Sequence, residues 1–325
     1  MSLIDPFGRK INYLRLSVTD RCNMRCRYCM PEAGIEKLQP REILSYEDLY
    51  RIAQVAVEQG IEKIRVTGGE PLVRKGIVDF LTRLGQLPGL KELVLTTNGQ
   101  MLAEMATSLR AAGVRRVNVS LDSLDPETFV GITRRGDLRR VVAGLMAADR
   151  VGLGIKINMV VMRGINDHEI DEFASLTVNR EVTVRFIEYM PSLKEPNWRA
   201  RVVSGDEIIH RLSARYALEA IDSAERAGPA REYRINGALG KLGVITAVSG
   251  HFCNNCNRVR VTATGMARSC LFADNGVDLR PLLAGDGNVA LARGIRRVVI
   301  DKPSRHHLDD EQAEYRAFAM AAIGG

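Results

Sequence analysis

Six cysteines occur in the 325-residue chain, and they fall into two groups of three. The first group is Cys22, Cys26 and Cys29, with the spacing C-x3-C-x2-C. Three thiolates on one compact loop can hold three irons of a [4Fe–4S] cluster, whereas a structural zinc site takes four ligands. Such a loop leaves the fourth iron without a protein ligand, so that iron is open to another molecule. The spacing therefore favours a cluster that binds a ligand, with zinc and a remote fourth ligand as the alternative.

The second group is Cys253, Cys256 and Cys270, with the spacing C-x2-C-x13-C. It again offers only three thiolates, so it predicts a second [4Fe–4S] cluster with one open iron. His251 lies two residues before Cys253 and could complete a zinc site instead. We expect a reducing compartment, where structural disulfides are rare, so the cysteines are interpreted as metal ligands.

The composition indicates a globular protein with an anionic partner. Hydrophobic residues make up 46% of the chain and charged residues 26%, and the formal net charge is +7. A basic protein tends to bind something negative, which fits either a nucleotide or a nucleic acid. The sequence has no apolar run long enough for a membrane helix and no secretory signal at its start, so we expect a cytoplasmic location and no membrane contact.

Short β-branched runs alternate with amphipathic segments through most of the chain. The expected strands are 12–19, 63–67, 92–97, 116–121, 155–161 and 183–189. The expected helices are 46–59, 77–84, 102–112, 138–151 and 169–178. This alternation predicts βα units and a parallel sheet, either a partial barrel or an open doubly wound sheet.

The pattern changes after about residue 223. Segments 232–236 and 241–247 are typical of a hairpin, and 259–264 of another short strand. We therefore predict two domains: residues 1–223 as the βα domain, and residues 224–325 as a smaller α+β domain that carries the second cysteine group.

Polar and glycine residues lie at or directly after the carboxyl ends of the first three expected strands. Thr19 leads into the first cysteine group, 68–71 has the sequence Gly-Gly-Glu-Pro, and 96–99 has the sequence Thr-Thr-Asn-Gly. In parallel βα architectures the carboxyl ends of the strands carry the active site. The three segments therefore predict one site at this edge.

The first cysteine group, with Tyr28 before its last cysteine and the Gly-Gly-Glu-Pro segment after the second strand, resembles the radical SAM superfamily. The resemblance implies a partial (βα)6 barrel, S-adenosylmethionine (SAM) bound at the open iron, and its cleavage to a 5′-deoxyadenosyl radical that abstracts a substrate hydrogen. By position, the residues implied to contact SAM are Tyr28, Gly68, Gly69, Glu70, Ser120 and Met190.

The second cysteine group, with Arg258 and Arg260 behind it and Gly324-Gly325 at the end of the chain, resembles the GTP 3′,8-cyclases of molybdenum cofactor biosynthesis. The resemblance implies abstraction of H3′ from GTP and formation of a C3′–C8 bond, giving 3′,8-cyclo-7,8-dihydro-GTP. It implies a low-potential electron donor, a downstream cyclic pyranopterin monophosphate synthase and no nucleic-acid partner. The implied catalytic residues are Arg258, Arg260, Gly324 and Gly325, and the implied GTP contacts are Arg15, Arg65, Thr96, Lys156, Arg185, Arg258 and Arg260.

Other functions fit parts of this pattern. A peptide-modifying radical SAM maturase also has an auxiliary cluster, although such enzymes usually carry more cysteines than the three found after residue 223. A basic, zinc-containing nucleic-acid-binding protein leaves the Gly-Gly-Glu-Pro segment unexplained. An electron carrier needs neither an open iron nor the arginines.

Overall fold

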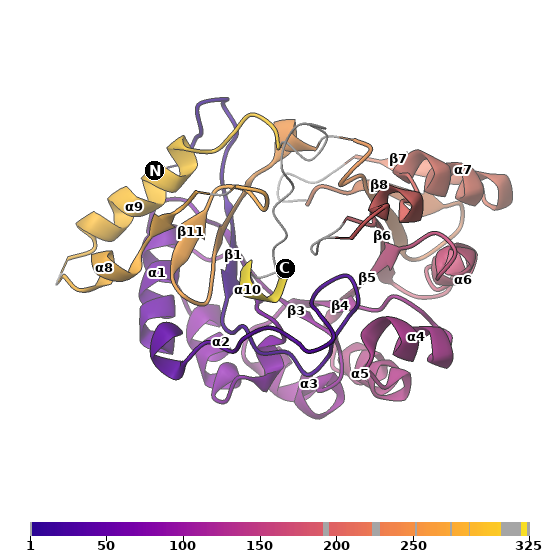
Figure 1. The fold of residues 1–325 in the computed structure, drawn as a ribbon, viewed down its shortest axis with the longest axis horizontal. Helices are drawn as coiled ribbons and strands as arrows, with labels where there is room; N and C mark the ends of the chain where they lie inside the picture. The colour runs from indigo at the N-terminus through magenta and orange to yellow at the C-terminus, as the bar shows by residue number, and fades with distance from the viewer. Residues whose placement is uncertain are drawn as a thin grey trace.

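The computed structural model describes residues 2–190, 195–222, 228–250, 252–273, 275–285, 287–306 and 320–323. Six parallel strands form the centre of its sheet, in chain order (Figure 1). They are β1 (Tyr13–Ser17), β2 (Lys63–Thr67), β3 (Glu92–Thr97), β4 (Arg116–Ser120), β5 (Gly154–Val161) and β6 (Val182–Glu188). The six predicted strands are confirmed: 63–67 and 92–97 match at both ends, and the other four differ by one or two residues at an end.

Helices lie outside this curved sheet in Figure 1. They are α1 (Tyr46–Glu58), α2 (Ile77–Gly85), α3 (Leu102–Ala111), α4 (Pro126–Thr133), α5 (Leu138–Arg150), α6 (Ile170–Ser175) and α7 (Gly205–Arg215). Their apolar faces and the strands share one buried core. Together they form the expected partial (βα)6 barrel.

Among α1 to α7, three helices differ from the prediction. The segment 169–178 is helical only as α6, because a 3₁₀ turn (Asp167–Glu169) precedes it and the chain leaves the helix after Ser175. The prediction also did not include α7 or α4, although the signal for the start of α4 is present. Asp125 caps it by accepting a hydrogen bond from Thr128 N (2.8 Å), and Pro126 occupies its first position.

The part of the chain after residue 215 adds strands to both edges of the same sheet. β7 (Leu218–Ile221), β8 (Arg231–Ile235) and β9 (Lys241–Ile245) are antiparallel neighbours, and β9 pairs parallel with β6. β10 (Arg258–Val261) pairs parallel with β1, followed by β11 (Met266–Arg268) and β12 (Val277–Asp278). The predicted hairpin and short strand are confirmed, and the domain division at residue 224 stays a prediction.

Three helices complete the described structure: α8 (Arg280–Leu283), α9 (Val289–Ile300) and α10 (Met320–Ile323). α9 packs near α1, whereas α10 lies inside the arc of strands in Figure 1. Within the described residues, no helix is long and apolar enough to cross a membrane.

Candidate active site

A cavity of about 300 Å³ joins the two cysteine groups, which are more than 220 residues apart in the sequence. Most of the residues singled out from the sequence line it: the six cysteines, Arg15, Tyr28, Arg65, Gly68, Gly69, Thr96, Ser120, Arg185, Met190, Arg258 and Arg260. Glu70 and Lys156 are not among the lining residues. Gly324 and Gly325 lie outside the described residues, as does His251.

The Gly68-Gly69 turn packs directly against the first cysteine loop. Gly69 N donates to Thr19 O (2.8 Å), and Glu70 N donates to Arg21 O (2.8 Å). A Cβ atom would lie 2.7 Å from Thr19 O if added to Gly68, and 2.5 Å from Arg21 O if added to Gly69. Both positions therefore require glycine for close backbone approach, which fixes the cysteine loop to the end of β2.

Glu70 connects the loops around the cavity. Its buried carboxylate accepts hydrogen bonds from Leu72 N (3.1 Å), Thr97 Oγ1 (2.8 Å) and Asn98 N (2.6 Å). Burial raises the pKa of Glu70 to about 7, although these donors favour the ionised form. Asn98 in turn donates to Asn23 Oδ1 in the cysteine loop (2.7 Å). The side chain of Glu70 thus connects the segment after β2 to the end of β3, and Asn98 connects that end to the cysteine loop.

We expect Glu70→Ala to lower the free energy of unfolding by about 2–4 kcal/mol, because it leaves buried donors without an acceptor. Denaturant unfolding of the metal-free protein under reducing conditions measures this change. Glu104→Ala is the matched control, since Glu104 is exposed and its ion pair with Arg140 (3.0 Å) contributes little. A loss for Glu70→Ala as small as that of the control would contradict this role.

Tyr28 and Asp122 form a largely buried pair beside the first cysteine group. Asp122 Oδ2 accepts a hydrogen bond from Tyr28 OH (2.8 Å), and Oδ1 accepts from Val160 N (2.9 Å). Burial raises the pKa of Asp122 to about 6. Asp122 was not predicted from the sequence, although it lies two residues after Ser120 at the same strand end. Asn158, the register partner of Ser120, was also missed and lines the cavity.

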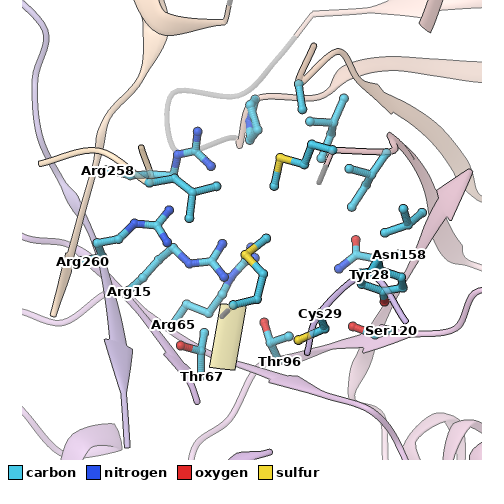
Figure 2. Close-up of a pocket in the computed structure, with 18 of the residues that line it drawn as sticks. Arg15, Tyr28, Cys29, Arg65, Thr67, Thr96, Ser120, Asn158, Arg258 and Arg260 are labelled. Carbon is cyan, nitrogen blue, oxygen red and sulfur yellow. The ribbon is translucent and has the colours of Figure 1, made fainter. Parts of the chain in front are cut away.

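Arginines from neighbouring strands lie side by side on the other wall. Arg260 of β10 is in register with Arg15 of β1, which is in register with Arg65 of β2. Arg268 of β11 continues the row beside Arg260. Figure 2 shows Arg15, Arg65, Arg258 and Arg260 together on one side of the cavity. Adjacent strands are only about 4.8 Å apart, so these like charges repel.

The guanidinium groups of Arg65 and Arg260 stay charged although they are buried. Burial lowers the pKa of Arg65 and of Arg260 to about 10, which is still well above neutral pH. Among the described residues, Arg65 Nε, Arg260 Nη1 and the hydroxyls of Thr67 and Thr96 have no hydrogen-bond partner. Buried polar groups are normally paired. This wall therefore has the charge and the hydrogen-bonding capacity to hold an anionic, polar ligand.

Lys156 and Arg185 share a carboxylate that the sequence analysis did not single out. Glu232 Oε1 lies 3.6 Å from Lys156 Nζ and 3.3 Å from Arg185 Nη2. Burial, together with the cations Arg185 and Arg116, lowers the pKa of Lys156 to about 7. Lys156 is thus a cation that gains or loses its proton near neutral pH.

The thiols of the two groups have different environments. Burial and the neighbouring Cys29 raise the pKa of Cys26 well above its ordinary value. Burial also opposes ionisation of Cys256, but Arg258 and Lys302 outweigh it and lower the pKa of Cys256 to about 6. Among the described residues, no three His, Cys, Asp or Glu side chains are placed to hold a single metal ion. The donor set, three soft thiol ligands per group on one cavity, fits two iron–sulfur clusters.

Two family models together match most of the chain. Residues 16–177 match the radical SAM superfamily, and residues 182–308 match a family described as Molybdenum Cofactor Synthesis C. Among solved structures, Streptococcus suis SuiB bound to S-adenosylmethionine is 14% identical with a TM-score of 0.60, covering 89% of this chain and 69% of that chain. The enzyme anSMEcpe with bound AdoMet and a peptide is 13% identical with a TM-score of 0.57, covering 96% and 92%. These likenesses concern the fold.

Curated relatives match over the whole length. The GTP 3′,8-cyclase of Geobacter sulfurreducens is 62% identical, covering 100% of both chains. That of Peptoclostridium acidaminophilum is 47% identical, covering 99% of this chain and 98% of its own. The chain therefore belongs to the GTP 3′,8-cyclase family of the radical SAM superfamily.

Proposed function

We propose that this protein converts GTP to 3′,8-cyclo-7,8-dihydro-GTP, with SAM and two [4Fe–4S] clusters as cofactors. The observation that carries the proposal is the single cavity, in which the two cysteine groups and a wall of buried arginines meet. When bound, the first cluster and SAM supply a 5′-deoxyadenosyl radical, which can abstract H3′ of GTP. The protein's own residues bind, orient and shield the reacting groups.

The SAM half of the site consists of residues at the ends of β1, β2, β4 and β6. We assign Cys22, Cys26 and Cys29 to the first cluster. Contacts to SAM are assigned to the main chain of 68–70 and to Tyr28, Ser120 and Met190. The hydrogen bond from Tyr28 to Asp122 fixes the direction of the Tyr28 ring, so the ring is already oriented before the ligand binds.

The GTP half consists of the second cysteine group and the cationic wall. Guanidinium groups bind phosphate oxygens and polar base edges through paired hydrogen bonds, and a triphosphate offsets the repulsion within the arginine row. We assign Cys253, Cys256 and Cys270 to the second cluster and the GTP contacts to Arg15, Arg65, Thr96, Lys156, Arg185, Arg258 and Arg260. Because the two halves face each other across one cavity, they would hold C3′ near both the radical source and C8.

The C-terminal tail and the partners complete the proposal. Met320 lines the cavity and Ile323 is buried, which supports a catalytic role for Gly324 and Gly325 directly after them. The reaction further requires a low-potential electron donor. Its product would pass to a cyclic pyranopterin monophosphate synthase in the cytoplasm.

An anaerobic turnover tests this function. The reconstituted protein is mixed with SAM, GTP and a low-potential reductant, and 5′-deoxyadenosine and a cyclised GTP isomer are quantified. We expect both products, and only when GTP is present. If 5′-deoxyadenosine forms without any change to GTP, the substrate assignment is wrong and peptide substrates come next. If the sites contain zinc and no iron, the whole assignment is wrong.

The binding of GTP should also take up a proton at Lys156. The charged groups around this amine are Arg116, Arg185, Glu232 and Lys63. With a pKa of about 7 the amine is mostly neutral at pH 8, and a bound triphosphate raises that pKa. Binding at pH 8 is therefore expected to take up as much as about 0.9 proton, and the affinity should fall as the pH rises above 7.

Calorimetry in two buffers of different ionisation enthalpy measures the proton uptake. Lys156→Arg is the matched variant, since arginine stays charged at pH 7 and at pH 8. It should bind GTP with no uptake at this position and a flatter pH profile. Equal uptake by the parent and the variant would show that Lys156 does not meet the triphosphate.

A further inference from the structure

A buried lysine links the segment that follows Cys256 to the segment that precedes Cys270. Lys302 follows α9 and is only 3% exposed. Its Nζ donates to Arg258 O (2.8 Å) and to Ser269 O (2.6 Å). Arg258 lies two residues after Cys256, and Ser269 directly precedes Cys270. One ammonium group therefore sets the separation of two segments that bear cluster ligands.

The residues next to Lys302 connect through Arg9 to Cys253, the remaining cysteine of the group. Arg9 Nη1 donates to Cys253 O (2.7 Å) and to Ser304 O (3.1 Å), and Arg9 Nη2 donates to Pro303 O (2.6 Å). Arg9 is itself fixed by a buried ion pair with Asp5. The segment 302–304 thus connects, directly or through Arg9, to the neighbourhood of all three cysteines.

The charge of Lys302 is placed for an anionic neighbour. Burial lowers its pKa, whereas the thiols of Cys256 and Cys270 raise it. Burying an ammonium group is unfavourable unless an opposite charge offsets it. Three thiolates around an iron–sulfur cluster supply that charge.

We propose that Lys302 is a positioning residue of the second iron–sulfur cluster, which holds the segments of Cys256 and Cys270 at the spacing of the cluster and raises its reduction potential through its positive charge. The inference rests on the proposed function, because it requires the second cluster. Its physical basis is that hydrogen bonds and charges around the ligands set both the affinity for the metal and its potential.

Three variants test this role in a Cys22→Ala background, in which the first cluster is lost and the signals of the second cluster can be measured by themselves. Lys302→Met removes charge and hydrogen bonds, Lys302→Gln keeps a donor without the charge, and Lys91→Met is the surface control, since Lys91 is exposed and pairs with Glu62 (3.1 Å). Iron and sulfide content, retention of iron against a chelator, and the potential from an EPR-monitored redox titration are measured. Circular dichroism of the metal-free chains checks folding.

We expect Lys302→Met to retain iron about 10–100-fold less well than the parent. Lys302→Gln should keep more of the iron but titrate at a more negative potential, and Lys91→Met should match the parent. If Lys302→Met does not fold, the potential of Lys302→Gln carries the test. Parent-like retention and potential in the folded Lys302 variants would overturn this inference alone. A parent that binds no second cluster would overturn the proposed function as well.

Discussion

Changing Cys256 to alanine is expected to abolish the cyclised product of GTP while the protein still cleaves SAM. Cys256 is the cysteine whose pKa falls to about 6 through Arg258 and Lys302, so it is mostly thiolate at neutral pH and ready to bind iron. Loss of a residue that hydrogen-bonds to a metal ligand already weakens a metal site by about 10–100-fold. Loss of a ligand should therefore lower the yield of product by at least about 100-fold.

The matched variant is Cys22→Ala, which removes a ligand of the first cluster. It should form neither 5′-deoxyadenosine nor cyclised product, whereas Cys256→Ala should still release 5′-deoxyadenosine. Both compounds are quantified from the same anaerobic reaction. A Cys256→Ala protein that makes cyclised GTP at the parent rate would show that the second cysteine group does not serve the substrate.

The sequence predicted what depends on local patterns. The thiol spacing located both cysteine groups, and strand–helix alternation located β1 to β6, because apolar and β-branched runs are short-range features. The sequence could not predict that β10 pairs with β1, since the register of Arg15 with Arg260 joins segments 245 residues apart. That pairing turns isolated arginines into one wall.

The missed residues are those whose partners lie far away in the chain. Glu188 ends β6, and its buried carboxylate accepts hydrogen bonds from Gly205 N (2.6 Å), Val248 N (2.7 Å) and Ser249 N (2.8 Å). It thereby holds the loop that leads into the second cysteine group. Its sequence signal is only an acidic residue at a strand end, and the backbone groups that it binds carry no sequence signal at all. Asp122 was missed for the same reason.

The arginine wall should lower the stability of the ligand-free protein and raise its affinity for the ligand. Arg260→Met removes one of several like charges that lie on adjacent strands, and apolar replacement of a buried ion is often stabilising. We expect the free energy of unfolding of the metal-free, ligand-free protein to rise by about 1–2 kcal/mol. For a chain of this size the melting temperature would increase by roughly 1.5–3 °C.

The same change should weaken GTP binding by about 10–100-fold, because a charge-assisted hydrogen bond contributes about 1.5–3 kcal/mol. Arg297→Met is the control, since Arg297 is exposed on α9 and pairs with Asp301 (2.8 Å), and it should change neither quantity. Melting curves with and without GTP give both effects in one experiment. Lower stability of Arg260→Met without GTP would mean that the row is already neutralised within the protein. Higher stability with weaker binding would mean that the repulsion among the arginines is kept because the triphosphate relieves it.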